Sequence, residues 1–151
     1  MQETVDGAYV VLLVIPAEPR WLALSRLVLS GICQLGRIDD ETLADLKLAV
    51  TEACTNAILH AYGDGAAGDL VVRYRFRAAT VEIEVEDDGS GFDPDDPGAR
   101  VSELGGEGMG LLIIRTLTDL LEIESDASGS RVFFTKAVGR DAEDGAAPAV
   151  G

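Results

Sequence analysis

The chain has 151 residues, of which 47% are hydrophobic and 26% are charged, and this composition fits one compact domain with its own core. Its formal net charge of −15 argues against direct binding to nucleic acid, because neutralising phosphates requires clustered Lys and Arg. The apolar run from Ala8 to Ile15 is too short to span a bilayer and lacks the basic flank of a signal peptide. We therefore expect a cytoplasmic protein without membrane contact.

The first elements in chain order are a strand and a helix. Tyr9 to Ile15 predicts a strand, which Pro16 and Pro19 end. Cys33 and Cys54, in the two helical segments that follow, lack CxxC or metal-ligand spacing, so both are predicted to be small core residues. The first of these helices is predicted from the helical spacing of its apolar residues Trp21, Leu24, Leu27, Val28 and Ile32.

A longer helix is predicted to begin near Asp39 or Asp40, the candidate N-caps, and to continue to about Tyr62. Glu52 and Asn56 lie one turn apart at the edge of its apolar stripe. A carboxylate and a carboxamide placed there can activate a hydroxyl group and ligate a hard cation such as Mg²⁺. The pair also fits a half-exposed position on an ordinary amphipathic helix. The stripe itself consists of Leu43, Leu46, Val50, Ala57 and Ala61.

Two strands with clean alternation of apolar and charged residues predict a hairpin that sets a row of arginines against a row of glutamates. The same alternation places Asp87 on the buried face and Asp88 on the outer face. A buried carboxylate needs a hydrogen-bond donor, and the exocyclic amine of a purine would serve. The segment 87–91 also fits a plain Asp-Gly turn. The alternating residues are Val72, Tyr74, Phe76, Val81, Ile83 and Val85 on one face, and Arg73, Arg75, Arg77, Glu82, Glu84 and Glu86 on the other.

A glycine cluster from Gly105 to Gly110 leads into the apolar helical segment Leu111 to Leu121. Glycines at the start of a helix let backbone N–H groups approach phosphate oxygens. Neither a Walker A pattern nor a dinucleotide fingerprint fits, and a flexible hinge is the other interpretation. The polar segment from Phe92 to Leu104 suits a lid over a ligand.

The chain is predicted to close with a second hairpin and a tail. Leu121 to Ser125 and Arg131 to Lys136 predict the two strands of this hairpin. The small and polar residues from Gly139 onward predict a disordered tail over residues 139–151.

Three motifs in this order resemble the N, G1 and G2 boxes of the Bergerat-fold (GHKL) ATPases: Glu52 to Ala57 on a helix, Asp87 to Gly91 after a strand, and Gly106 to Gly110 before a helix. The segments Ile15 to Pro19 and Thr51 to Gly63 resemble more narrowly the bacterial anti-sigma factor serine kinases of the RsbW and SpoIIAB type.

The resemblance implies a histidine-kinase-like (GHKL) ATPase domain over residues 1–138. It also implies the Bergerat fold, an α+β fold. This is a two-layer α/β sandwich whose mixed, mostly antiparallel sheet is covered on one face by about three helices.

For the reacting groups, the resemblance implies that Glu52 acts as general base on a serine of a partner protein and that Asn56 ligates the Mg²⁺ that bridges the ATP phosphates. Asp87 would accept a hydrogen bond from the adenine amine, in agreement with the strand alternation. Arg26 on the first helix, which we expect to lie away from the glycine motifs, would contact the sigma factor or its antagonist. His60 is given no catalytic role. The other positions implied to bind ATP are Gly89, Gly91, Gly106, Gly108, Met109, Gly110 and Thr135.

The function implied by the resemblance is that of an anti-sigma factor and protein serine kinase. Such a protein binds Mg²⁺-ATP, phosphorylates a single-domain anti-sigma antagonist on serine, sequesters a sigma factor and forms a homodimer. The alternative is an ATP-binding anti-sigma module without kinase activity. Glu52 discriminates between the two, because a sequestering module needs no base at that position.

Overall fold

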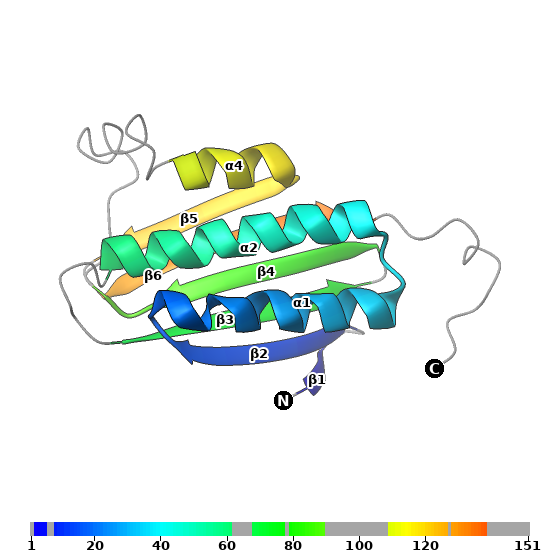
Figure 1. Cartoon of the computed structure of the whole chain (residues 1–151), viewed down its shortest axis with the longest axis horizontal. Helices are drawn as coiled ribbons and strands as arrows, with labels where there is room; N and C mark the ends of the chain where they lie inside the picture. The colour runs from blue at the N-terminus through cyan, green and yellow to red at the C-terminus, as the bar shows by residue number, and fades with distance from the viewer. Residues whose placement is uncertain are drawn as a thin grey trace.

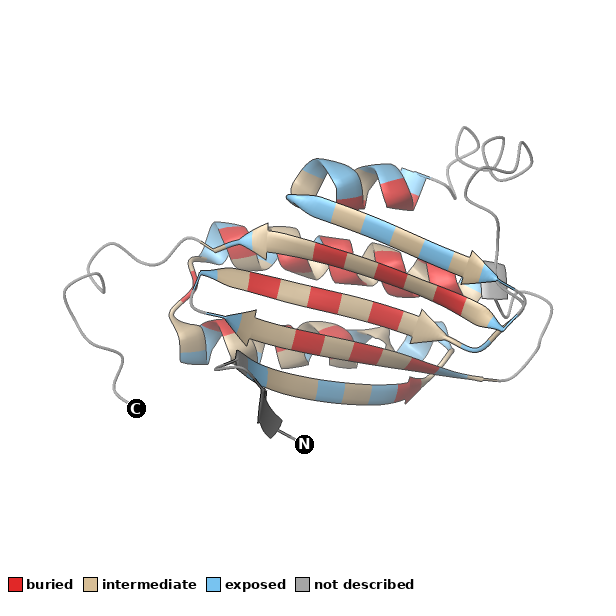
Figure 2. Ribbon diagram, turned by 180° about the vertical axis from the view of Figure 1, so that it is seen from behind, coloured by how far each residue is buried: buried red, intermediate tan, exposed pale blue. Residues whose placement is uncertain are grey.

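A computed structural model of the protein describes residues 2–5, 8–61, 68–77, 79–89, 109–126 and 128–138. Helices α1, α2 and α4 lie on one face of a six-stranded sheet (Figures 1 and 2). The elements are β1 (Gln2–Val5), β2 (Ala8–Pro16), η1 (Pro19–Trp21), α1 (Leu22–Gly36), α2 (Asp40–Ala61), β3 (Asp69–Arg77), β4 (Thr80–Asp87), α4 (Met109–Leu117), β5 (Leu120–Asp126) and β6 (Gly129–Ala137).

The strand order is β1-β2-β3-β4-β6-β5. Every pairing between the described strands is antiparallel, where a mixed, mostly antiparallel sheet was predicted. The predicted α+β sandwich, with its helices on one face of the sheet, is confirmed.

Strict alternation along β3, β4 and β6 lets the sheet bury only one face. Buried residues alternate with half-buried ones along these strands (Figure 2). On the outer face the predicted register is observed, with Arg73 opposite Glu84 and Arg75 opposite Glu82. Arg131 of β6 extends the row through an ion pair with Glu84. Such partly exposed pairs contribute only about 0–1 kcal/mol each, so they set the register more than the stability.

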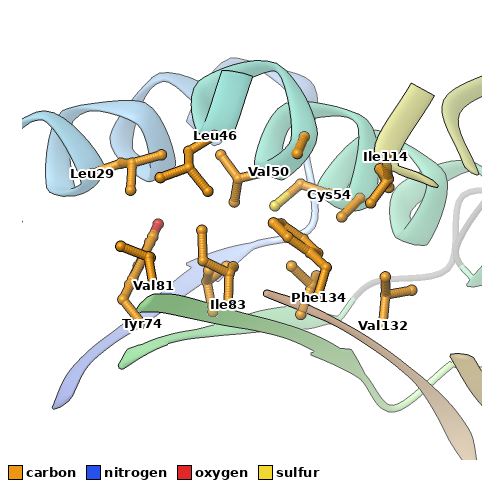
Figure 3. Packing of buried hydrophobic residues seen from close by; sticks show 14 of the residues in the cluster. Leu29, Leu46, Val50, Cys54, Tyr74, Val81, Ile83, Ile114, Val132 and Phe134 are labelled. Carbon is orange, nitrogen blue, oxygen red and sulfur yellow. The ribbon is translucent and has the colours of Figure 1, made fainter. Parts of the chain in front are cut away.

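The core fills the space between the three helices and the inner face of the sheet (Figure 3). The buried hydroxyl of Tyr74 on β3 donates to the backbone carbonyl of Ser25 on α1 at 2.9 Å, which ties the two layers together. Cys33 and Cys54 are free and buried, as predicted. Burial raises the pKa of the Cys33 thiol to about 11 and that of the Cys54 thiol to about 12, so both are unreactive.

The long helix α2 forms as predicted. The backbone N–H of Thr42 donates to Oδ1 of Asp39 at 3.1 Å, so Asp39 is the N-cap. Leu46, Val50 and Ala57 of the predicted stripe are buried, and α2 packs on β4 and β6. The rotation of α2 about its axis, and therefore the placement of Glu52 and Asn56, follows from this stripe.

The predicted apolar face of α1 is confirmed in part: Trp21, Leu24, Val28 and Ile32 pack half-buried against the core. Leu27 is 64% exposed, while the buried residues of the helix are Ser25, Leu29 and Cys33. Apolar residues lie almost all round this helix, so their spacing does not determine which side faces the sheet. Ser25 tolerates burial because its hydroxyl donates to the carbonyl oxygen of Leu22 at 2.7 Å.

The third helix is shorter than the predicted segment to Leu121. It ends at Leu117, whose carbonyl oxygen accepts a hydrogen bond from Nζ of Lys136 at 2.7 Å, and β5 begins at Leu120. The lid over residues 92–104 and the tail over residues 139–151 lie outside the described residues. Within the described part of the chain, no helix is both long and apolar enough to cross a membrane.

Candidate functional site

Most of the described residues of the predicted site gather at one end of the sandwich. At the left of Figure 1, the C-terminal half of α2 lies at the same end as the end of β4, the start of β6 and the N-terminus of α4. Helix α2 packs against all three of these elements. The fold therefore brings the described parts of the three motifs to one region, although they are far apart in the sequence.

Glu52 and Asn56 come from consecutive turns of α2, so their Cβ atoms lie roughly 5–6 Å apart. Glu52 is half-buried, whereas Asn56 is only 3% exposed. The predicted position at the edge of the core is confirmed for Glu52. Asn56 lies deeper than predicted.

Neither polar atom of the Asn56 side chain, Oδ1 or Nδ2, has a hydrogen-bond partner among the described residues. An unpaired buried polar group costs about 1–3 kcal/mol, so such groups usually serve a ligand, an ion or a water molecule. Oδ1 is the kind of hard oxygen that Mg²⁺ binds, and Nδ2 can donate to a phosphate oxygen. The Asn56 side chain therefore fits its predicted role as a ligand of the Mg²⁺ that accompanies the nucleotide.

The carboxylate of Glu52 lies against the first turn of α4. A Cβ atom added to Gly110 would be 3.3 Å from Oε1 of Glu52. The first backbone N–H groups of a helix point out of its N-terminus, where the helix dipole also favours anions. The predicted base and the predicted phosphate-binding backbone are therefore neighbours.

Asp87 has the inward orientation that the strand alternation predicts. It stands opposite Ser130 of β6 and Leu70 of β3, both of which are buried, although Asp87 itself is half-buried at the end of its strand. Oδ1 of Asp87 accepts a hydrogen bond from the backbone N–H of Gly89 at 3.0 Å, and Oδ2 accepts one from the Ser130 hydroxyl. A carboxylate has about four lone-pair sites, so Asp87 is held in place and can still accept a further donor.

Sequence analysis missed Ser130 and its neighbour Gly129. The φ angle of Gly129 is 142°, and a Cβ atom there would overlap the carbonyl oxygen of Asp87, so only glycine fits. The two residues support Asp87 from a strand that lies 43 positions further along the chain. The Gly-Ser pair at the start of a strand was the available signal in the sequence. It points to Asp87 only once β6 is known to pair with β4.

The predicted nucleotide role of Thr135 is not supported, because the structure does not bring this residue to Asp87. The buried residues of β6 are Ser130, Val132 and Phe134, so Thr135 points to the outer face. It pairs with Glu82 and Leu120, roughly 16 Å along the strand from Ser130. The polar residue that β6 directs toward Asp87 is Ser130.

Arg26 of α1 contacts α2 next to the predicted base. Its Nη1 donates to Oγ1 of Thr51 at 3.1 Å, and the Thr51 hydroxyl donates to the carbonyl oxygen of Lys47 at 2.7 Å. Thr51 directly precedes Glu52 on α2. Helix α1 thus reaches the helix that carries Glu52, and its expected separation from the glycine motifs stays a prediction.

A shallow hollow of about 230 Å³ opens beside Asp87 at the end of the β5–β6 hairpin. Its charged lining is mostly acidic, which does not suit the phosphates of a nucleotide. The phosphate groups fit better on the helix side of the site, beside Asn56 and α4. The charged residues of the hollow are Glu86, Asp87, Glu124, Asp126 and Arg131.

Some predicted positions lie outside the described residues. These are Gly91, Gly106, Gly108 and the side chain of His60. Met109 is exposed at the start of α4. The roles assigned to the three glycines and to Met109 stay predictions.

The fold and the site together define a class of protein. The profile of the histidine kinase-like ATPase domain family matches residues 15–136, which include Glu52, Asn56, Asp87 and Gly110. Curated relatives identify a narrower family within this class. The chain is 38% identical over 131 residues to the serine-protein kinase RsbW of Bacillus velezensis, and the match covers 81% of each chain. It is also 38% identical over 156 residues to RsbW of Bacillus pumilus, covering 95% of this chain and 93% of that protein. The chain belongs to the RsbW serine-protein kinase family.

Solved structures agree on the fold. The RsbU and RsbW domains of a Mycobacterium tuberculosis protein superpose with a TM-score of 0.65 at 22% identity, covering 87% of this chain and 34% of that one. The chain thus spans about a third of that larger protein. A histidine kinase domain from Erythrobacter litoralis gives a TM-score of 0.53 at 25% identity, covering 81% of this chain and 65% of that chain.

Proposed function

We propose that the protein binds Mg²⁺-ATP, phosphorylates a single-domain anti-sigma antagonist on serine, and sequesters a sigma factor. The observation that carries the proposal is the arrangement on α2, where the buried Asn56, whose polar atoms have no partner among the described residues, lies one turn from Glu52. Glu52 in turn lies beside the N-terminus of α4. The naming of curated relatives as serine-protein kinases supports the same activity.

In the proposed reaction, the serine oxygen forms a bond to the γ-phosphorus, the bond from that phosphorus to the β,γ-bridging oxygen breaks, and ADP leaves. Glu52 accepts the proton that the serine hydroxyl loses. Its half-buried position leaves the carboxylate accessible to an incoming hydroxyl group. Mg²⁺, when bound, neutralises part of the phosphate charge, and Asn56 is the residue that would hold it through Oδ1.

The sheet end of the site would bind the base. Asp87 would accept a hydrogen bond from the adenine amine, with Ser130 and Gly89 holding its carboxylate in place. Gly89 and Gly91 would let the base pack close to the backbone. On the helix side, the ATP phosphates would be bound by Gly106, Gly108 and Met109, and by the backbone N–H group of Gly110.

The partner contacts belong to the same proposal. Arg26 would meet the sigma factor or the antagonist from α1, next to the α2 turn that carries Glu52. A homodimer in the cytoplasm, where ATP and sigma factors are available, completes the proposed assembly.

Incubation with γ-labelled ATP, Mg²⁺ and purified single-domain antagonists encoded by the same genome tests the proposal. The expected result is labelled phosphoserine on one antagonist, lost in Glu52→Ala and kept in Glu41→Ala, an exposed acidic residue at the start of the same helix. Binding of ATP and of a sigma factor without transfer to any antagonist would instead favour the module without kinase activity.

A further inference from the structure

Gly110 occupies a buried position in the first turn of α4, where this helix packs on α2. The three atoms nearest to a Cβ added there all belong to Glu52: Oε1 at 3.3 Å, Cβ at 3.6 Å and the carbonyl oxygen at 3.7 Å. The last two distances are ordinary van der Waals contacts, whereas the first is tighter than most Cβ contacts. A methyl group at position 110 would therefore displace one group above all, the Glu52 carboxylate.

The fold itself does not require glycine at this position. The φ angle of Gly110 is not in the left-handed range, since Gly129 is the positive-φ glycine among the described residues. A carboxylate at the end of a flexible side chain can move by a few tenths of an ångström without disturbing the backbone. Alanine is also a better helix former than glycine. Stability alone would favour a side chain at position 110.

Catalysis, in contrast, favours a position 110 without a side chain. A base must stay within hydrogen-bond reach of the proton it accepts, and a displacement of about 1 Å can lower a rate by about 10²-fold. We propose that Gly110 is a positioning residue, whose missing side chain lets the Glu52 carboxylate lie against the first turn of α4 in its working position. This inference rests on the proposed function of Glu52 as the base. It is separate from the proposed phosphate contact of the Gly110 backbone N–H group, which alanine would keep.

The variant Gly110→Ala tests the proposal. We expect a melting temperature equal to or above that of the wild type, an ATP dissociation constant within about 3-fold, and a roughly 10-fold lower rate of phosphoryl transfer at saturating ATP. Gly31→Ala is the matched control, because this exposed glycine of α1 has nothing within 4 Å of its Cβ position. It should leave transfer unchanged. Weaker ATP binding by Gly110→Ala with an unchanged saturated rate would assign the glycine to the phosphates and overturn the proposal.

A shorter base supplies a second test. Glu52→Asp withdraws the carboxylate from position 110 and lowers transfer by itself. In this background, Gly110→Ala should reduce the rate by less than about 2-fold further, because the contact is already gone. The same 10-fold loss in both backgrounds would show that Gly110 acts independently of Glu52, contrary to the proposal.

A third measurement needs no protein substrate. The side-chain carboxyl carbon of Glu52, identified in the ¹³C NMR spectrum by its loss in Glu52→Gln, should shift in Gly110→Ala and stay in place in Gly31→Ala. An unmoved resonance in Gly110→Ala would overturn the positioning role even if no transfer were detected. By contrast, full transfer by Glu52→Ala would overturn the base assignment of the proposed function, and the resonance would still report whether Gly110 positions the carboxylate.

Discussion

The two ends of the candidate site differ in how completely the protein satisfies their polar groups. At the sheet end, both carboxylate oxygens of Asp87 accept hydrogen bonds from Gly89 and Ser130. At the helix end, Asn56 is more deeply buried, yet neither of its polar atoms has a partner in the described part of the chain. The sheet end thus has a fixed geometry suited to recognising one edge of a base. We infer that the helix end is completed by its ligand.

The glycines repeat this contrast. Gly129 at the sheet end is required by its backbone angle and by the Asp87 carbonyl, so it serves the fold. At Gly110, at the helix end, the one close contact of an added Cβ would be with the flexible Glu52 carboxylate, so this glycine serves the chemistry. Substitutions at the two ends should therefore affect different quantities. At the sheet end they should change stability and recognition of the base, and at the helix end they should change phosphoryl transfer and phosphate binding.

The largest effect is expected at the helix end. Glu52→Ala should lower phosphoryl transfer by roughly 10²-fold or more, the usual consequence of losing a general base, while ATP affinity stays within a few-fold. Single-turnover transfer and calorimetric ATP titration measure the two quantities separately. Equal transfer rates for the wild type and the variant would remove Glu52 from the chemistry.

At the sheet end, the largest expected effect is on folding. Gly129→Ala should lower the free energy of unfolding by roughly 2–3 kcal/mol, because it combines a disfavoured φ angle with overlap at the Asp87 carbonyl. Urea denaturation beside Gly31→Ala, a helix glycine in open space, provides the comparison. If Gly129→Ala were as stable as Gly31→Ala, the support that Gly129 gives to Asp87 would not be needed.

Base recognition should respond to Asp87→Asn. The carboxylate would accept from the adenine amine, which guanine replaces with a carbonyl, so ATP affinity should fall by about 10-fold and GTP affinity should not. Asp88→Asn, on the exposed neighbour, is the control. Calorimetric titration of the wild type and both variants with ATP and with GTP measures these affinities. Wild-type binding of GTP as tight as that of ATP, or damage from Asp88→Asn alone, would refute the role of Asp87.

The smallest effect concerns the partner surface. Arg26→Glu should weaken binding of the sigma factor or the antagonist by about 1–2 kcal/mol. ATP affinity should stay within a few-fold, because Arg26 bonds to Thr51 rather than to Glu52 or Asn56. The variant Thr51→Val separates partner recognition from packing between α1 and α2. It removes the hydroxyl group that Arg26 contacts and keeps the positive charge of Arg26. A fall in melting temperature with unchanged partner binding would show that Arg26 only packs against α2.

Local patterns in the sequence predicted the parts of the site that depend on a single element. Strand alternation placed Asp87 on the inner face, and helix periodicity placed Glu52 and Asn56 on one edge of α2. The predictions for Asp87 and Glu52 held, because an alternating strand or an amphipathic helix contains the information about its own orientation, although Asn56 lies deeper than predicted.

Features that depend on pairing between distant segments could not be predicted in this way. Ser130 and Gly129 support Asp87 only through the β4–β6 register, and Thr135 was chosen from a motif without that register. The burial of Ser25 and the exposure of Leu27 on α1 were missed for a related reason. Apolar residues alone leave the most buried line of this helix undetermined, and contacts such as that of Tyr74 with Ser25 decide it.

The most direct measurement for the central claim is a melting curve of Asn56→Leu with and without Mg²⁺-ATP. Leucine keeps the branched arrangement of side-chain heavy atoms and removes the polar atoms that have no partner in the described part of the chain, so without nucleotide the variant should melt at or above the wild-type temperature. Mg²⁺-ATP at about 100 times its dissociation constant should stabilise the wild type by about 2.7 kcal/mol and the variant by far less. A variant that melts lower without nucleotide, and is stabilised by Mg²⁺-ATP as much as the wild type, would contradict the claim that the ligand completes this end of the site.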